Sequence, residues 1–257
     1  MLLAVDIGNS NTVVGVFRGP DLVQHWRLST EADRTPDELA LLFSGLLGFA
    51  GLDFSHNVHG VVMGSVVPPV TETFREMCER YFPFPPVIVE PGVRTGIVLR
   101  HENPREIGAD RIANAVAAHA LYGGPAIVVD FGTATSFDAV SSDGAFVGGA
   151  IAPGVHASAD ALVERAARLP KVETLAPSSP IGRSTVTALQ SGIVYGFAGQ
   201  VDGIVERIGA ELGPGVTTVA TGGAARAVLD ACRTIDHHDQ WLTLKGLRLV
   251  WERNAAG

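Results

Sequence analysis

The sequence predicts an α/β protein of two similar lobes, each a mixed β-sheet flanked by helices. The chain has 257 residues, which is enough for two domains of about 100 to 150 residues each. Segments with the pattern of strands alternate with segments with the pattern of helices. Their order is nearly the same in both halves of the chain, so we expect one lobe over residues 1–115 and a second over residues 116–257.

The first half opens with three short strands joined by turns into an antiparallel meander, at Leu2–Val5, Thr12–Phe17 and Leu22–Leu28. A helix should follow, because Thr35 can cap its first turn and Pro36 suits its first position. The remaining apolar patterns predict a strand, a helix and a strand, at Val58–Met63, Pro69–Phe82 and Val87–Val89.

The second half begins this order again, with strands expected at Ala126–Val129, Ser136–Val140 and Phe146–Ile151. A helix opened by Gly154 and a long helix come next, and then a strand and a further helix, the last three at Thr185–Leu212, Val216–Ala220 and Ala224–Ala231. The pattern beyond them does not define the expected C-terminal strand and helix.

The two halves also match residue by residue. Leu3–Ser10 (LAVDIGNS) corresponds to Ile127–Ala134 (IVVDFGTA), which places Asp6 and Asp130 124 residues apart. In each copy an apolar strand ends in an aspartate, and a glycine two residues later starts a turn rich in hydroxyl and amide side chains. Internal duplication explains this match, and we expect the two turns to face each other across a cleft.

Both turns have the composition of a phosphate-binding site. A glycine lets backbone N–H groups converge on phosphate oxygens, and Gly8 and Gly132 supply it. Side-chain donors are present at the same places, namely Asn9, Ser10, Asn11, Thr12, Thr133 and Thr135. Asp6 and Asp130 can hold a hard cation such as Mg²⁺. One Asp-x-Gly corner is common in structural turns, but two at corresponding places favour nucleotide binding.

Net charge, the motifs present and the length of apolar runs exclude several other functions. The formal charge is −8, and 17 Arg and two Lys form no basic cluster, so nucleic acid is not an expected partner. No G-x-x-x-x-G-K-[ST] motif is present, which excludes a P-loop enzyme. No apolar run is long enough for a membrane span, and we expect a cytoplasmic protein. Cys78 and Cys232 are expected to be reduced core thiols in helices.

Three further segments have both a structural and a functional interpretation. Gly108–Arg111 starts an apolar helix, where an aspartate beside an arginine is either a surface pair or part of an anion-binding helix terminus. Gly182–Thr185 reads as a helix cap. Thr221–Gly223 reads as a tight strand-to-helix turn. His237–Asp239 is either a metal site or a solvated loop, and we expect the loop because no further ligand clusters with it.

Taken together, these motifs resemble the superfamily that contains acetate and sugar kinases, actin and the seventy-kilodalton heat-shock chaperones. Within that superfamily they are similar to the type III pantothenate kinases, and they occur in the family's order from residue 6 to about residue 223. The resemblance implies two duplicated ribonuclease H-like (actin-like) lobes with the active site in the cleft between them. It also implies ATP-dependent phosphorylation of pantothenate to 4'-phosphopantothenate, the first step of coenzyme A biosynthesis.

The resemblance also implies roles for individual residues. Asp110 would be the general base, and pantothenate would contact Gly108, Ala109, Asp110, Arg111 and Thr185. ATP would bind Asp6, Ile7, Gly8, Asn9, Ser10, Asn11, Thr12, Val13 and Thr133, with Gly222 and Gly223 near the adenosine. Asp130 would hold a monovalent cation, K⁺ or NH₄⁺, while the residue chemistry itself lets Asp6 hold Mg²⁺ directly or through water. The family's contact at Thr185 forms at a dimer interface, so the resemblance implies a homodimer.

Two other functions would also explain some of these motifs. The ATP motifs alone also suit a kinase whose acceptor is a sugar or an acid, although Gly108–Arg111 favours pantothenate. A nucleotide-sensing regulator that binds ATP without turnover would use the same fold. The presence of Asp6, Asp110, Arg111 and Asp130 together favours an active enzyme.

Overall fold

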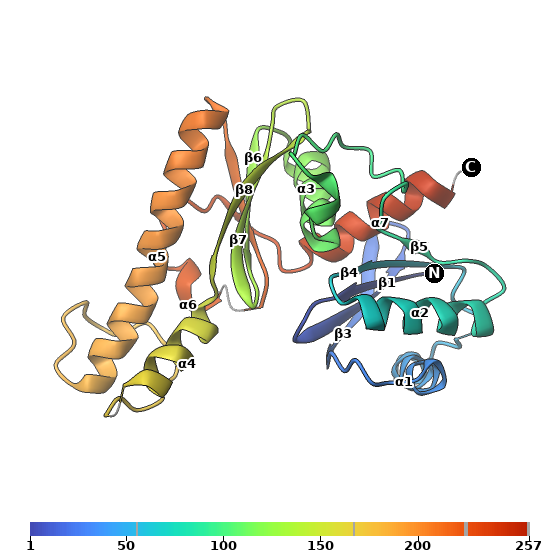
Figure 1. Cartoon of the computed structure of the whole chain (residues 1–257), viewed down its shortest axis with the longest axis horizontal. Helices are drawn as coiled ribbons and strands as arrows, with labels where there is room; N and C mark the ends of the chain where they lie inside the picture. The colour runs from blue at the N-terminus through green and yellow to red at the C-terminus, as the bar shows by residue number, and fades with distance from the viewer. Residues whose placement is uncertain (55, 167, 224–225, 256–257) are drawn as a thin grey trace. The chain divides into compact units, whose positions relative to one another are not determined.

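The structure is a computed structural model that describes residues 1–54, 56–166, 168–223 and 226–255. It divides into two compact units, each containing one five-stranded sheet (Figure 1). Unit 1 comprises Met1–Ile97, Glu102–Ala117 and the C-terminal helix, and unit 2 comprises Val98–His101 and Ala118–Trp241.

The sheet of unit 1 has the order β3-β2-β1-β4-β5, in which β1 is antiparallel to β2 and parallel to β4. Its strands are β1 (Leu2–Ile7), β2 (Asn11–Arg18), β3 (Asp21–Ser29), β4 (Gly60–Ser65) and β5 (Val87–Ile88). Its helices are α1 (Pro36–Phe49), α2 (Pro68–Tyr81), the first part of α3 (Ala109–Tyr122), α7 (Leu242–Ala255) and the short 3-10 helix η1 (Pro104–Glu106). The expected meander and the elements after it are confirmed.

The cap of α1 shows how local sequence defines these elements. Thr35 is the N-cap, and its hydroxyl accepts a hydrogen bond from the backbone N–H of Glu38. The Glu38 carboxylate in turn accepts one from the backbone N–H of Thr35, which completes a capping box. Leu39, Phe43 and Leu47 then pack into the core beneath the sheet. The predicted start of this helix is confirmed at Pro36.

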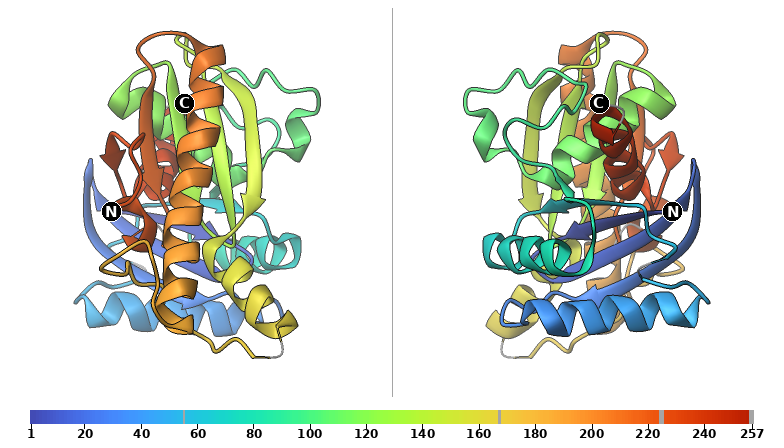
Figure 2. Two further views of the ribbon diagram at one scale, coloured as in Figure 1. Left: turned by 90° about the vertical axis from the view of Figure 1, so that its left-hand side faces the viewer. Right: turned by 90° about the vertical axis from the view of Figure 1, so that its right-hand side faces the viewer.

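The sheet of unit 2 repeats the topology of unit 1 strand for strand. Its order is β10-β9-β6-β7-β8, and β6 is antiparallel to β7 and parallel to β9. The elements are β6 (Ala126–Phe131), β7 (Ala134–Val140), β8 (Phe146–Pro153), α4 (Val155–Arg165), α5 (Thr185–Leu212), β9 (Thr217–Thr221), α6 (Arg226–Leu229) and β10 (His237–His238). Helix α5 runs along one face of this sheet (Figure 2). The expected duplication is therefore confirmed, while residues 224–225 of the last predicted helix lie outside the described residues.

The C-terminal helix α7 packs on the first sheet, although it follows the second in the chain. Glycines on β4 make room for it. A Cβ atom built on Gly60 would lie 2.5 Å from the ring of Trp251, and one built on Gly64 would lie 3.0 Å from Leu247. A cut into residues 1–115 and 116–257 therefore differs from the observed grouping, because α7 buries its apolar side chains against unit 1.

Two smaller expectations need correction. His237 and His238 form strand β10 rather than a loop. Asp239 beside them is buried and accepts hydrogen bonds from the Tyr122 hydroxyl at 3.0 Å and the Trp241 backbone N–H at 3.1 Å. Cys232 lies after α6 instead of within a helix. The cysteines are free thiols, and burial raises the pKa of each to about 12.

None of the helices in the described ranges is both long and apolar enough to cross a membrane.

We predict that Gly246→Ala destabilises unit 1. A Cβ atom at Gly246 would lie 1.9 Å from the Ala113 carbonyl oxygen, so α7 must move away from α3. Overpacking of this kind should lower the free energy of unfolding by about 1–3 kcal/mol, measured by urea denaturation. Gly45→Ala is the control, because Gly45 of α1 has open space around it and alanine favours a helix. Equal stability of the two variants would contradict this account of α7.

Candidate active site

The first candidate turn follows β1 directly. Asp6 is the penultimate residue of the strand, and the turn that starts at Gly8 closes with a hydrogen bond of 3.0 Å from the Gly8 N–H to the Asn11 carbonyl. Asn9, Ser10 and Asn11 are exposed, so their donors are accessible to a ligand. Thr12 is buried beside the turn and Val13 lies in β2. The predicted ATP-binding residues 6–13 thus form one continuous strand, turn and strand.

The register of the sheet decides which face Asp6 lies on. Asp6 pairs with Gly64 of β4, and paired residues share a face of the sheet. Leu3, Val5 and Ile7 alternate with Asp6 and pack into the core on the other face. A Cβ atom on Gly64 would lie 3.4 Å from the Cβ of Ala109. The first residue of α3 therefore packs on the strand residue next to Asp6.

Gly108–Arg111 forms the beginning of α3, as expected. The Gly108 carbonyl accepts a hydrogen bond from the Ile112 N–H at 3.1 Å, and Asp110 lies in the first helical turn. The Asp110 carboxylate accepts one from the Arg111 N–H at 2.8 Å and folds back over Gly108, where a Cβ atom would lie 2.3 Å from it. Asp110 and Arg111 are both partly buried. Unit 1 therefore brings the predicted base close to the strand that carries Asp6.

The second candidate turn, in unit 2, is enclosed by two other segments. The Gly132 N–H donates to the Ala134 carbonyl at 2.9 Å. Gly222 has a φ of 93°, and a Cβ atom on it would lie 2.5 Å from the Asp130 carboxylate. A Cβ atom on Gly154 would lie 2.3 Å from the Thr133 carbonyl oxygen. Only glycine fits at these two positions, which bring the end of β9 and the start of α4 against the Asp130 turn.

The hydroxyl groups of this turn differ in their surroundings. Thr133 is exposed, whereas Thr135 is completely buried, and its hydroxyl has no hydrogen-bond partner within the part of the chain that the structure describes. A buried hydroxyl without a partner is costly. Gly223 is exposed beside Gly222. Glycine backbone packs closely against one side of this turn. The exposed donors leave another side open to a ligand.

Thr185 occupies the first position of α5, and its side chain is exposed. The N-cap is its neighbour Ser184, whose hydroxyl accepts a hydrogen bond from the Thr187 N–H at 3.2 Å. The predicted cap is therefore confirmed, and Ser184 rather than Thr185 performs it. Thr185 remains available for contact with another molecule.

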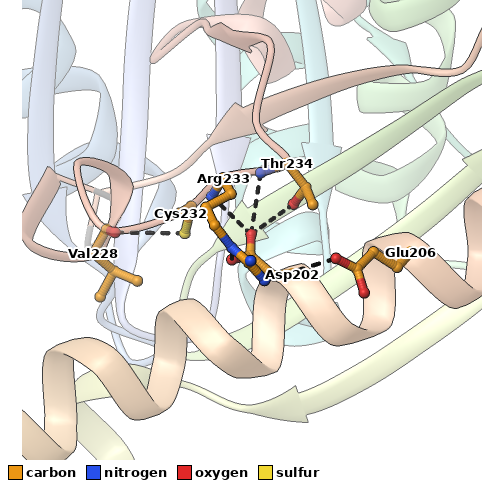
Figure 3. Close-up of polar contacts among 6 residues, drawn as sticks. All are labelled: Asp202, Glu206, Val228, Cys232, Arg233 and Thr234. Carbon is orange, nitrogen blue, oxygen red and sulfur yellow. Dashed lines mark hydrogen bonds and ion pairs between the residues drawn. The ribbon is translucent and has the colours of Figure 1, made fainter.

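Asp202 is a buried carboxylate that the sequence analysis did not identify (Figure 3). It accepts backbone hydrogen bonds from Arg233 at 2.9 Å and Thr234 at 3.1 Å, and side-chain bonds from both residues. Burial by itself raises the pKa of Asp202, but these hydrogen bonds outweigh it and hold the pKa below its ordinary value. Asp202 thereby fastens the segment after α6 to α5.

The described residues contain no metal site made by protein side chains alone. Within residues 1–54, 56–166, 168–223 and 226–255, no group of three or more His, Cys, Asp and Glu residues could hold an ion. His237–Asp239 belongs to no such group.

The family model and the relatives that match this chain all describe the same family of proteins. The family model described as type III pantothenate kinase matches residues 2–207. A type III pantothenate kinase from Acidothermus cellulolyticus is 57% identical over 255 residues, covering 99% of both chains. The one from Streptomyces avermitilis is 54% identical and covers 99% of this chain and 98% of its own.

Solved structures share the fold at low identity. Component A of the (R)-2-hydroxyglutaryl-CoA dehydratase of Acidaminococcus fermentans has a TM-score of 0.60 at 14% identity, covering 100% of this chain and 99% of that one. The ROK hexokinase of Thermus thermophilus has a TM-score of 0.53 at 16% identity, with the same coverage. The predicted fold class, two duplicated lobes of the actin-like type, is confirmed.

We predict that Asp202→Asn lowers the free energy of unfolding at pH 7 by about 2–3 kcal/mol, because the four donors of Arg233 and Thr234 lose their buried, charged acceptor. A carboxylate with a depressed pKa stabilises the fold above its ordinary pKa, and this contribution is lost as the pH falls through the folded-state value. The difference between variant and wild type should therefore shrink below about pH 4. Urea denaturation at pH 7 and pH 3 measures both.

The matched control is Glu206→Gln. Glu206 is an exposed partner of Arg233 at 3.8 Å, so its loss should change stability little at either pH. A pH-independent difference for Asp202→Asn would exclude the ionised carboxylate as the cause.

Proposed function

The chain belongs to the type III pantothenate kinase family, which phosphorylates pantothenate with ATP in coenzyme A biosynthesis, and we propose that Asp110 is the general base of this reaction. The observation that carries the proposal is the packing of the start of α3 on β4, beside Asp6. The acceptor hydroxyl must meet both a proton acceptor and the γ-phosphate. A carboxylate in the first turn of a helix next to the strand of a phosphate-binding turn suits that requirement.

Arg111 and Gly108 complete the proposed pantothenate contacts in unit 1. The guanidinium of Arg111 suits the pantothenate carboxylate, because its planar fork can bind a carboxylate through two hydrogen bonds. Glycine at position 108 lets the Asp110 carboxylate fold back over the helix start. Ala109 faces the sheet, so its backbone rather than its side chain would meet the substrate.

We propose that both aspartate turns bind ATP phosphates. Residues 6–13 and Thr133 would provide the contacts, and Gly222 and Gly223 would lie near the adenosine. Mg²⁺ commonly takes one or two carboxylates together with phosphate oxygens and water. Asp6 and Asp130, one at the end of each central strand, fit that donor set for Mg²⁺ and for K⁺ or NH₄⁺ respectively. Bound cations would neutralise charge that a lysine neutralises in P-loop enzymes.

We propose that the protein is cytoplasmic and that it forms a homodimer. Exposed apolar side chains of unit 2 support the homodimer. Ile151, Ile181 and Val186 are 66%, 76% and 44% exposed, and they lie on β8, before α5 and in its first turn. A hollow of about 280 Å³ bounded by α4 and α5 is lined by Leu162, Leu189 and other residues. Ile181 and Val186 lie on either side of Thr185 in the sequence, and exposed apolar side chains there suit a second copy of the chain, which would bury them.

We predict that Asp110→Asn lowers kcat for phosphopantothenate formation by about 10²- to 10⁴-fold, because the amide cannot accept the hydroxyl proton. The assay contains ATP, Mg²⁺, K⁺ and pantothenate, and thermal unfolding should show a folded protein. Asp21→Asn is the control, since Asp21 is the exposed first residue of β3 and pairs with Arg18 at the far end of β2. An active Asp110→Asn enzyme would exclude Asp110 as the base, and an inactive wild type would exclude the proposed reaction.

We also predict that Ile181→Asp converts a dimer into a monomer, because a buried carboxylate at the interface lacks a partner. Light scattering after size-exclusion chromatography measures the mass, and activity should fall with it. Phe49→Asp is the control. Phe49 is 89% exposed on α1 of unit 1, so the variant should stay dimeric. Dissociation of the Phe49 variant alone would place the interface on unit 1 instead.

A further inference from the structure

Thr30 makes three hydrogen bonds to residues 8–12, the first of the two turns proposed to bind phosphate, and it belongs to no sequence motif. It follows the last residue of β3 and is partly buried. Its backbone N–H donates to the Ser10 carbonyl at 3.1 Å, and its hydroxyl donates to the Gly8 carbonyl at 2.7 Å. Its hydroxyl oxygen also lies 2.9 Å from that of Thr12. Thr30 therefore contacts the turn at its start, its middle and its end.

The direction of these bonds follows from the number of protons. A threonine hydroxyl has one proton to donate and can accept as well. Because Thr30 gives its proton to Gly8, the Thr12 hydroxyl must donate to Thr30. The Thr12 hydroxyl is thus oriented by Thr30, and Thr30 by the turn backbone. One side chain fixes both a carbonyl and a neighbouring hydroxyl.

These bonds also fix the direction of two amide groups. The C=O of one residue and the N–H of the next share a planar trans peptide and point in opposite directions. Thr30 holds the Gly8 and Ser10 carbonyls, so the N–H groups of Asn9 and Asn11 point away from Thr30. The third constraint is the bond from the Gly8 N–H to the Asn11 carbonyl. The Gly8–Asn9 and Ser10–Asn11 peptide planes are therefore set by neighbouring protein groups, before any ligand binds.

We propose that Thr30 is a positioning residue that holds the Asn9 and Asn11 amides ready for the ATP phosphates. This inference rests on the proposed function, because it requires that the turn binds phosphate. N–H donors that are already oriented do not have to reorganise when the ATP phosphates bind. Because that free-energy cost is avoided, ATP binds more tightly and phosphoryl transfer is faster. Without the hydroxyl, the Gly8–Asn9 peptide is free to rotate, and ATP must orient it.

The test compares Thr30→Val, which removes the hydroxyl and keeps the β-branched shape, with Thr30→Ser, which keeps the hydroxyl. We expect Thr30→Val to raise the KM for ATP and the Kd for a non-hydrolysable ATP analogue about tenfold, the effect of one net hydrogen bond. The KM for pantothenate should stay at its wild-type value. Thr30→Ser should restore ATP binding to within about threefold of wild type. Thr30→Ala replaces the valine variant in this comparison if that variant does not fold.

Thr73→Val is the matched control. The Thr73 hydroxyl donates to the Pro69 carbonyl at 3.1 Å on α2, in the same unit and away from the turn. It should leave both KM values unchanged. Wild-type ATP affinity in Thr30→Val, or equal losses in Thr30→Val and Thr30→Ser, would overturn the positioning role. A wild-type enzyme that forms no phosphopantothenate would instead overturn the proposed function, so the two failures are distinguishable.

Discussion

The candidate site depends on the two-residue alternation of the central strand in each sheet. In β1, Leu3, Val5 and Ile7 face the core, and in β6 the equivalent residues Ile127, Val129 and Phe131 do the same. Asp6 and Asp130 fall between them and therefore lie on the opposite face. A slip of one residue would place each aspartate in an apolar core, where an unpaired charge is prohibitively costly. The burial that stabilises each sheet thus also fixes the position of its carboxylate.

Glycine supplies the second requirement, which is close approach of backbone segments. Gly64 lets α3 and α7 pack on β4, while Gly154 and Gly222 let two segments close on the Asp130 turn. A site built in this way offers backbone N–H groups rather than long charged side chains. That agrees with a chain that has only Lys171 and Lys245, neither of them near a phosphate turn in the sequence. Metal ions and peptide dipoles are then the natural source of positive charge for transferred phosphate.

Much of the fold could be predicted from sequence because its signals are local. Short apolar runs that end in an aspartate predicted β1 and β6, and Thr35 followed by Pro36 predicted the start of α1. The repeated Asp-x-Gly corner identified the two turns. What the sequence did not show depends on contacts between distant residues. The packing of α7 requires glycines almost 200 residues earlier, such as Gly60 against Trp251.

In the candidate site, too, some residues can be recognised from the sequence and others only from contacts between distant residues. Gly108–Arg111 was recognisable as a helix start, although its packing beside Asp6 depends on the register between β1 and β4. Thr30 carries no motif, and only the pairing of β3 with β2 brings its hydroxyl to Gly8. The number of hydrogen bonds then distinguishes Asp110 from Asp202, which the sequence analysis did not identify. Asp202 accepts four, which occupies the lone pairs of a carboxylate and makes it an anchor. Asp110 accepts one from the described residues, from Arg111, and keeps acceptor capacity for a substrate proton.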